Sequence, residues 1–349
     1  METILFLAHT EADGTLTKAA LEVLGAAADL SKQLSATLAV GLYGAGARAA
    51  AIAVGTCGAQ RFLSVSGEEF SQPRYATDAA AGEALVRVAG ATIVVAAGTS
   101  RNARVMGGVA HRLNGSIDTH VTGMQAGPTA LTITRWFYRQ RIEGSLSRTT
   151  RPWILLLDPG THSPWQGDAA AAALEELPLE VPETLRRTTM RGIVTPPADQ
   201  QTIRPDAKLL FVAGAGWTKK QKDGQTHVAE AETLIVDFLG RSNASLGGSK
   251  SLVDLSGENQ TALRFMTHLN QVGQTGASPR HPKGLATCCH GEEPHTVGWR
   301  FIGERRAINL DPNCGWARGK ADVLYVADAF EVMGKLNALL STKVIANRH

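Results

Sequence analysis

Hydrophobic positions in the first 160 residues follow two alternating patterns. Short apolar runs predict buried strands, and the clearest of these are Ile4–Ala8 and Ala91–Ala96. Between such runs lie longer segments with apolar residues three and four positions apart, as in Thr17–Leu34, and this period predicts amphipathic helices. The other strands expected here are Ala36–Gly41, Gln60–Val65, Thr129–Arg135 and Trp153–Leu157, and the other helices are Ala49–Val54, Tyr75–Val88 and Val105–Leu113. Strands that alternate with helices in this way predict a doubly wound parallel sheet.

A second alternation of strands and helices begins near Ala207. Its expected strands include Leu209–Gly214 and Asp322–Ala327, and its expected helices include Thr226–Leu239 and Phe330–Leu340. This pattern predicts a second doubly wound α/β domain.

Prolines are dense between the two alternations, which is typical of a connection between domains. The alanine-rich piece Asp168–Glu176 within it is compatible with a helix that packs on the first domain. We therefore expect a first α/β domain over residues 1–160 and a proline-rich connection over 161–206. A second domain is expected over 207–330, followed by a closing helix and tail over 331–349.

Short polar or glycine-rich turns interrupt the second domain between Leu246 and Pro312. They are 247–254, 272–276, 290–295 and 309–312. A parallel α/β sheet places such turns at the carboxyl ends of its strands, where ligands bind. Glycines let the backbone approach a ligand closely, and the exposed N–H groups of the turns suit phosphates or the edge of a flavin.

The bulk composition excludes several classes of protein. Hydrophobic residues make up 44% of the 349 residues and charged residues 19%, which is globular composition, and the net charge of +3 gives no reason to expect a nucleic-acid partner. The N-terminus lacks the basic region of a signal peptide, and no apolar run is long enough to cross a bilayer. We therefore expect no membrane insertion and a cytoplasmic location.

The four cysteines, Cys57, Cys288, Cys289 and Cys314, do not form a disulfide framework in a chain of this length. Adjacent cysteines in a strand point to opposite faces, so buried reduced thiols are favoured over a metal site. No Ser-His-Asp or Cys-His arrangement stands out, so no catalytic residue is expected.

Two motifs in the second domain stand in a fixed register. Val272–Gly276 reads Val-Gly-Gln-Thr-Gly, and Asn309–Pro312 reads Asn-Leu-Asp-Pro after an interval of 32 residues. The pair resembles the flavin-binding domain of the electron transfer flavoprotein alpha subunit family, which has Val-Gly-Gln-Thr-Gly and then Asn-Lys-Asp-Pro at the same interval. Residues 1–160 resemble the nucleotide-binding-like first domain of that family in pattern only. The resemblance implies a Rossmann-like second domain that binds FAD.

The resemblance also implies roles for single residues. The family threonine at Thr275 bonds the flavin ring, and the histidine at His295 contacts its pyrimidine carbonyl. Lys250 stands where the family has an arginine over the ring, and it keeps the charge without the planar fork. The expected FAD-binding residues are Ser249, Lys250, Gly273, Gln274, Thr275, Gly276, His290, Gly291, His295, Asn309 and Asp328. Taken alone, Thr275 also suits a helix cap, Lys250 a solvated loop and His295 an exposed surface.

One loop departs from the family at the diphosphate. Ala213–Trp217 reads Ala-Gly-Ala-Gly-Trp where the family has Ser-Gly-Gly-Arg-Gly, so the arginine near the diphosphate is gone. Lys219 or Lys220 could replace it as point charges. A further departure is Glu292–Pro294, which places two negative charges near the expected ring site.

By resemblance, the chain is an electron carrier rather than an enzyme that turns over a substrate. It would pair with an electron transfer flavoprotein beta subunit as a heterodimer. It would accept electrons from a flavoprotein dehydrogenase and pass them to a membrane quinone-reducing oxidoreductase. Two alternatives stay open: a structural subunit of a dehydrogenase complex with a fixed or lost flavin, and a nicotinamide-dependent oxidoreductase.

Overall fold

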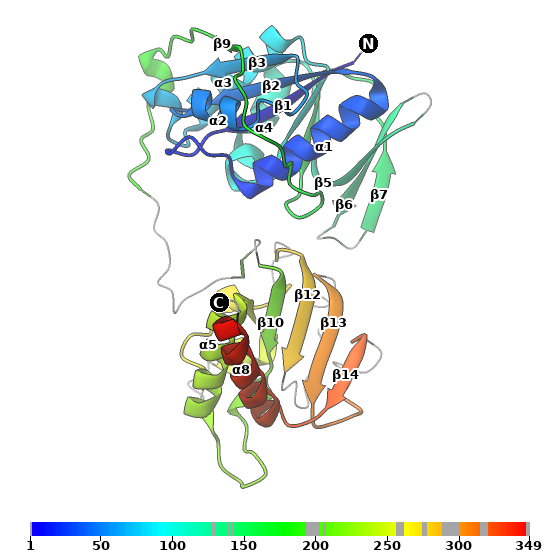
Figure 1. Ribbon diagram of the computed structural model, residues 1–349, viewed down its shortest axis with the longest axis vertical. Helices are drawn as coiled ribbons and strands as arrows, with labels where there is room; N and C mark the ends of the chain where they lie inside the picture. The colour runs from blue at the N-terminus through cyan, green and yellow to red at the C-terminus, as the bar shows by residue number, and fades with distance from the viewer. Residues whose placement is uncertain are drawn as a thin grey trace. The chain divides into compact units, whose positions relative to one another are not determined.

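The computed structural model divides the chain into two compact units, residues 1–193 and 194–349 (Figure 1). It describes residues 2–127, 130–138, 140, 142–192, 203–204, 207–255, 262–273, 278–287, 301–314 and 320–346, with side chains as far as 342. Each unit has its own sheet and its own hydrophobic core. The expected α/β class with two domains is therefore confirmed.

The described residues of unit 1, residues 1–193, form a nine-stranded mixed sheet with the order β7-β6-β5-β8-β4-β1-β2-β3-β9. Its strands are β1 (Thr3–His9), β2 (Thr37–Tyr43), β3 (Arg61–Val65), β4 (Ile93–Ala97), β5 (Ser116–Ala126), β6 (Leu131–Phe137), β7 (Ile142–Leu146), β8 (Trp153–Leu157) and β9 (Leu174–Glu176). In the sheet order, the neighbouring strands β5, β8, β4, β1, β2, β3 and β9 pair in parallel. At the β5 edge, β6 pairs antiparallel with β5 and β7 pairs antiparallel with β6.

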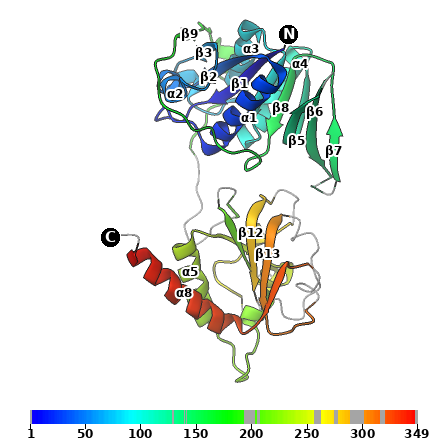
Figure 2. The same cartoon turned by 45° about the vertical axis from the view of Figure 1, so that its right-hand side comes forward.

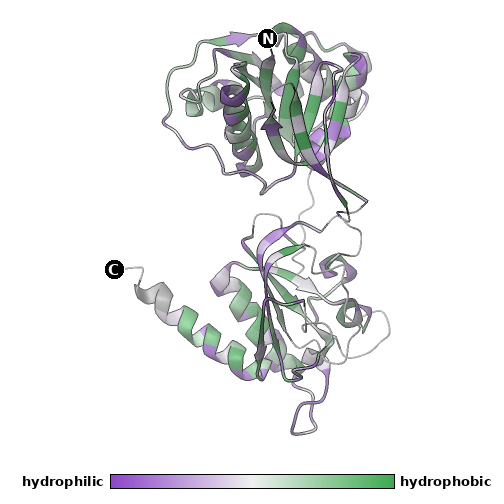
Figure 3. Ribbon diagram, turned by 90° about the vertical axis from the view of Figure 1, so that its right-hand side faces the viewer, coloured by the Kyte–Doolittle hydropathy of each residue, from purple (hydrophilic) through white to green (hydrophobic). Residues whose placement is uncertain are grey.

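Helices cover both faces of this sheet. They are α1 (Lys18–Leu34), α2 (Ala47–Ala53), α3 (Tyr75–Ala89) and α4 (Ser100–Arg112). α1 and α2 pack into one core cluster and α3 and α4 into the other, with apolar strands between them (Figure 3). Successive residues of β1 alternate between the clusters: Phe6 belongs to the first and Leu5 and Leu7 to the second. Because both faces are buried, β1 reads as a continuous apolar run in the sequence.

Unit 1 differs from the sequence-based expectation in three segments. The strands β5 and β7 were not expected, because their side chains are mostly half-buried or exposed and the sequence lacks an apolar run there. The piece Asp168–Glu176, expected as a helix, is extended, and residues 174–176 form β9 beside β3. The helix prediction was wrong because the backbone bonds to its neighbours: the N–H of Ala170 donates to the carbonyl of Ile52 at 3.0 Å and that of Leu177 to Ser64 at 2.7 Å.

The described residues of unit 2, residues 194–349, form a five-stranded parallel sheet with the order β11-β10-β12-β13-β14. Its strands are β10 (Leu209–Ala213), β11 (Ser245–Gly248), β12 (His281–Thr287), β13 (Ile302–Asn309) and β14 (Val323–Val326), and its helices are α5 (Val228–Ser242), α6 (Lys250–Asp254) and α8 (Ala329–Ala346). A single parallel bridge between Gly248 and Gln271 lies beyond β11. α5 and α8 pack together on one face of the sheet (Figure 2).

The chain leaves β10 toward β11 and later returns to the other side of β10 to form β12. The strand order therefore reverses between β10 and β12. In open parallel sheets, ligands bind in the crevice outside the carboxyl ends of the strands near such a reversal. In the described part of the chain, no helix is long and apolar enough to span a lipid bilayer.

Candidate functional site

The loop that follows β10 is anchored by a buried tryptophan. Trp217 is fully buried, and its indole Nε1–H donates to the hydroxyl of Thr287, the last residue of β12, at 2.8 Å. The same hydroxyl donates to the carbonyl of Val212 in β10 at 3.2 Å. The ring of Trp217 packs against Phe330 with ring centroids 4.6 Å apart. This set of contacts fixes the loop at the point where the strand order reverses.

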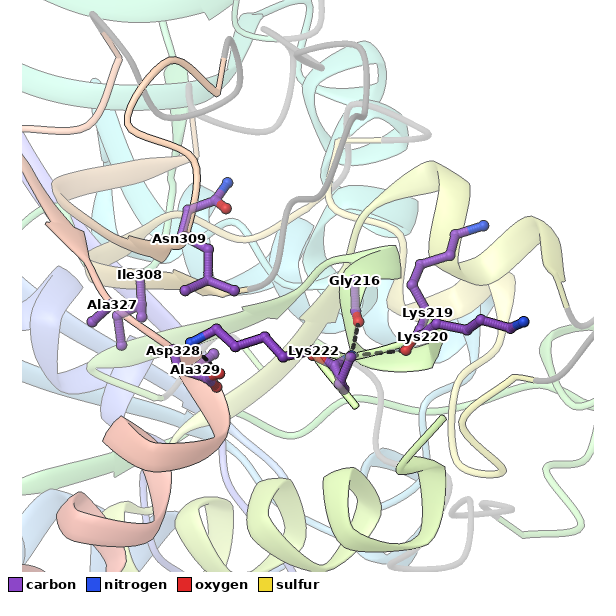
Figure 4. Close-up of a pocket in the computed structure, with 11 residues that line it drawn as sticks. Gly216, Lys219, Lys220, Lys222, Ile308, Asn309, Ala327, Asp328 and Ala329 are labelled. Carbon is purple, nitrogen blue, oxygen red and sulfur yellow. Dashed lines mark hydrogen bonds and ion pairs between the residues drawn. The ribbon is translucent and has the colours of Figure 1, made fainter. Parts of the chain in front are cut away.

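A pocket of about 270 Å³ opens beside this loop. Its walls come from the loop after β10, the end of β13 and the start of α8 (Figure 4). The lining residues are Gly216, Lys219, Lys220, Gln221, Lys222, Ile308, Asn309, Leu310, Ala327, Asp328 and Ala329. The pocket therefore lies at the carboxyl edge of the parallel sheet, where a ligand is expected.

Two of the expected FAD-binding residues, Asn309 and Asp328, meet at this pocket. Asn309 is the last residue of β13, and its side-chain oxygen accepts from the N–H of Asp311 at 3.2 Å. Asp328 follows β14, and one carboxylate oxygen accepts from the N–H of Phe330 at 2.9 Å in the first turn of α8. Both side chains are thus held in place by local backbone bonds.

The lysines of the pocket lie on one turn. The side-chain amide of Gln221 donates to the carbonyls of Gly216 at 3.1 Å and Lys219 at 2.7 Å, which holds the turn in shape. Lys222 reaches toward Asp328, with 3.9 Å between its Nζ and a carboxylate oxygen, whereas Lys219 and Lys220 point away from that carboxylate (Figure 4).

One acidic residue shares the turn. Asp223 accepts from the backbone N–H of Gln225 at 2.9 Å and lies 2.7 Å from the Nε2 of His227. These contacts, the backbone bond above all, hold the pKa of Asp223 below its usual range. Three lysines against two carboxylates leave the region basic, which suits an anionic group, while a carboxylate in the pocket suits a hydroxyl donor.

Three other expected residues gather at the end of β11, outside the pocket. The hydroxyl of Ser249 accepts from the N–H of Leu252 at 3.2 Å and so caps α6. Lys250 forms an ion pair with Asp254 one turn further on. Gly273 has a φ of +82°, and its N–H donates to the hydroxyl of Ser278 at 2.7 Å. The backbone positions Ser249 and Gly273 on neighbouring segments, since the N–H of Val272 donates to the carbonyl of Gly248.

The remaining expected FAD-binding residues lie outside the described residues. They are Gln274, Thr275, Gly276, His290, Gly291 and His295. Cys288 and Cys289 also lie outside them. Across the described ranges, no group of three or more His, Cys, Asp or Glu residues could hold a metal ion.

Lys222, Gln221 and Trp217 belong to the site although the sequence did not assign them a role. The signal that could have found Lys222 is the charge cluster Lys-Lys-Gln-Lys directly after a glycine-rich strand end. Nothing in the sequence marks Trp217 as an anchor, because its partner Thr287 is 70 residues away.

The pocket residues fit the ribose and diphosphate part of a dinucleotide such as FAD. A carboxylate and an amide at strand ends can bond hydroxyl groups, and ammonium groups beside them can neutralise phosphates. The structure gives no geometry for the flavin ring, because the residues assigned to it are outside the described ranges.

Comparison with known proteins gives one family match. The family model described as "Electron transfer flavoprotein domain" matches residues 4–182, which is more than half of the 349 residues and nearly all of unit 1. No curated protein matches the chain.

Proposed function

The chain belongs to the electron transfer flavoprotein family, and from this premise we propose that it is the alpha subunit of such a pair and binds FAD in unit 2. The family match covers unit 1, so the proposal for unit 2 needs its own support. That support is one observation: Asn309 and Asp328, which the resemblance assigns to FAD, line the same pocket at the carboxyl edge of the sheet.

The pocket residues have distinct tasks in this proposal. The carboxylate of Asp328 and the amide of Asn309 bond hydroxyl groups of the sugar and ribityl parts of FAD. The lysines of the turn neutralise the diphosphate, in place of the arginine that the family has in this loop. When bound, FAD supplies the electron chemistry, and the protein supplies its binding, orientation and electrostatic surroundings.

The ring contacts in the proposal come from the second group of residues. Ser249 and Lys250 follow β11, and Gly273 lies on the segment that bonds to Gly248 at the end of that strand. Thr275 and His295 complete the set by resemblance. Lys250 already pairs with Asp254, so part of its charge is neutralised before any flavin arrives. We therefore expect Lys250 to favour negative charge on the ring less strongly than an arginine in that position would.

The partners in the proposal follow from the family. The chain would form a heterodimer with a beta subunit in the cytoplasm. A flavoprotein dehydrogenase would donate electrons to it, and a membrane quinone-reducing oxidoreductase would accept them.

The test is the flavin content of the heterodimer. The chain is co-expressed with its beta subunit, and the visible spectrum and bound FAD of the purified complex are measured. We expect a yellow complex with one FAD in this subunit, which a donor dehydrogenase reduces. A colourless complex that takes up no added FAD would overturn the proposal and favour a structural subunit.

A further inference from the structure

A long strap leaves the end of β8 and crosses one face of unit 1. The strap, residues 158–176, contains no helix, and it passes over α1 and α2 before it adds β9 to the edge of the sheet (Figure 1). The N–H of Trp165 donates to the carbonyl of Leu21 at 2.8 Å, and that of Ala170 donates to the carbonyl of Ile52 at 3.0 Å. A segment held by single backbone bonds can open locally while the sheet beneath it stays folded.

The strap begins beside an irregular point of β5. The pairing of β5 with β8 shifts between Asp118 and Val121, and its pairing with β6 shifts between Val121 and Gly123. His120 stands at this bulge with a φ of +56°. A bulge redirects the side chain of its extra residue, and a residue other than glycine keeps a positive φ only where its surroundings hold it there.

Asp158, the first residue of the strap, holds His120. One carboxylate oxygen of Asp158 lies 3.2 Å from the Nδ1 of the imidazole, and its backbone N–H donates to the carbonyl of Val121 at 2.9 Å. The imidazole is 61% exposed, so it can gain or lose a proton at Nε2 without any unfolding. A protonated ring forms an ion pair with Asp158, whereas a neutral ring keeps a hydrogen bond without the charge that strengthens it.

Within the described part of unit 1, the charged side chains that act on His120 are those of Asp158 and of Arg135 in β6. Arg135 donates to the buried Asp118 at 2.8 Å, so its positive charge is partly balanced there. The hydrogen bond to Asp158 outweighs both burial and the repulsion from Arg135, and it holds the pKa of His120 above its ordinary value.

A second carboxylate holds the next turn of the strap on α1. The buried Glu22 accepts from the N–H of Gly160 at 2.6 Å and lies 3.7 Å from the ammonium group of Lys18. This contact involves no imidazole. The strap is therefore held near its start by one contact that changes when His120 titrates and by one that does not.

We propose that His120 and Asp158 form a pH-sensitive latch, which fastens the start of the strap to the bulge of β5 when the imidazole is protonated and loosens it when the proton leaves. Because the folded pKa of His120 is raised, the contribution of the latch is fully present below the unfolded value of about 6.5. It is lost as the pH rises through the folded pKa. The latch lies wholly in unit 1 and goes beyond the proposed function, since it needs no flavin.

The experiment combines two measurements on the full-length chain. Nuclear magnetic resonance follows the titration of the His120 ring, and hydrogen exchange at pH 6 and pH 8, corrected for intrinsic exchange, follows the amides of Asp158 and Gly160. The variants are Asp158→Asn and His120→Asn, since asparagine tolerates a positive φ but has no titrating ring. The matched control is His111→Gln, an exposed histidine near the end of α4. Circular dichroism and thermal melting show whether each variant is folded.

We expect His120 to titrate above about pH 6.5 in the unaltered chain and closer to that value in Asp158→Asn. Protection of the Asp158 amide falls about threefold from pH 6 to pH 8 in the unaltered chain and in His111→Gln, a small change because the pair is exposed. In His120→Asn the protection is equally low at both pH values. The amide of Gly160, which Glu22 holds, changes less than that of Asp158.

Two results would overturn the latch. One is a His120 titration that Asp158→Asn leaves unchanged. The other is an Asp158 amide whose protection depends on pH in His120→Asn as it does in the unaltered chain. Neither result bears on flavin binding, so the latch and the proposed function are tested separately.

Discussion

Asp118 is a fully buried carboxylate that joins three distant parts of unit 1. It accepts from Arg135 in β6 at 2.8 Å, from Arg148 at 3.0 Å, and from the indole N–H of Trp153 in β8 at 2.9 Å. Burial raises the pKa of Asp118, but the hydrogen bonds from Arg148, Trp153 and Arg135 outweigh it and hold the pKa below its usual range. The antiparallel edge of the sheet is thereby tied to its parallel centre.

Replacing this carboxylate is expected to destabilise unit 1. Asp118→Asn leaves two guanidinium groups without their anion, and we expect the free energy of unfolding to fall by about 3 kcal/mol. Because the folded pKa is below the unfolded value, the contribution of the carboxylate is fully present above about pH 4 and is lost as the pH falls through the folded pKa. Urea unfolding at neutral pH and at pH 3 measures both effects.

The matched control is Glu68→Gln, an exposed carboxylate of the same unit, which should change the free energy of unfolding by less than about 0.5 kcal/mol. If the difference in free energy of unfolding between Asp118→Asn and the unaltered chain were the same at pH 3 as at neutral pH, the charge of Asp118 would not be the source of the stabilisation.

The backbone conformation of His120 is a feature of a single residue that the sequence does not predict. It lies inside β5 with a φ of +56°, at the register shift between Asp118 and Val121, and its Nδ1 is 3.2 Å from a carboxylate oxygen of Asp158. The bond to Asp158 raises the pKa of His120, against a smaller effect of burial. Positive φ is uncommon for residues other than glycine, and no spacing in this segment predicts it.

At the scale of elements, the Trp217–Thr287 bond joins the loop after β10 to the end of β12. The two strands flank the reversal of strand order, so this bond sets how the pocket loop lies on the sheet. Both partners are fully buried, and an indole N–H without its acceptor would be costly there.

A double-mutant cycle tests this bond. Trp217→Phe keeps an aromatic ring without the N–H, and Thr287→Val removes the acceptor. We expect each single change to lower the free energy of unfolding of unit 2 by about 1–2 kcal/mol, with a coupling energy of about 1 kcal/mol between them. Additive effects would mean that the bond contributes nothing beyond packing.

Strands that are buried on both faces are the strands that the sequence predicts most directly. β1, β4 and β8 are continuous apolar runs, and each was expected within two residues of its bounds. The hairpin strand β7 escapes prediction because Ile142 and its neighbours are half-exposed, with no apolar run or clear alternation. Pairing with β6 rather than local preference makes it a strand.

The candidate site likewise contains residues that the sequence predicts and residues that it does not. Asn309 and Asp328 could be placed at strand ends from pattern and motif register alone. The part played by Lys222 depends on how Gln221 bonds its own turn and on the position of Asp328, which lies far along the chain, so neither can be predicted from residue pattern alone.

At the scale of the whole molecule, the two halves carry different kinds of family signal. The family model matches residues 4–182, where the sequence shows only a spread pattern of strands and helices. The short motifs Val272–Gly276 and Asn309–Pro312 lie in unit 2. The family signal of unit 1 is therefore spread over many weakly characteristic positions, whereas that of unit 2 is concentrated in a few strongly characteristic ones.

The start of unit 2 is fixed by residues before β10. The N–H of Arg204 donates to the hydroxyl of Ser245 at 2.7 Å, and its carbonyl accepts from the Nε2–H of the buried His281 at 2.8 Å. Ile203 packs against the core cluster on the face opposite α5. The body of unit 2 therefore begins at Ile203 or earlier, and not at Ala207 where the first strand pattern starts.

Two fragments test whether unit 2 folds by itself and where it begins. The cores of the units are formed by separate sets of residues, so we expect a fragment of residues 194–349 to fold alone, with one cooperative thermal transition. A fragment of 207–349 lacks Ile203 and both backbone bonds of Arg204, and leaves His281 without one acceptor. It should be less stable by about 2 kcal/mol in urea unfolding. Equal stability of the two fragments would mean that the backbone bonds of Arg204 to Ser245 and His281 do not stabilise unit 2. An unfolded longer fragment would mean that unit 2 depends on unit 1 to fold.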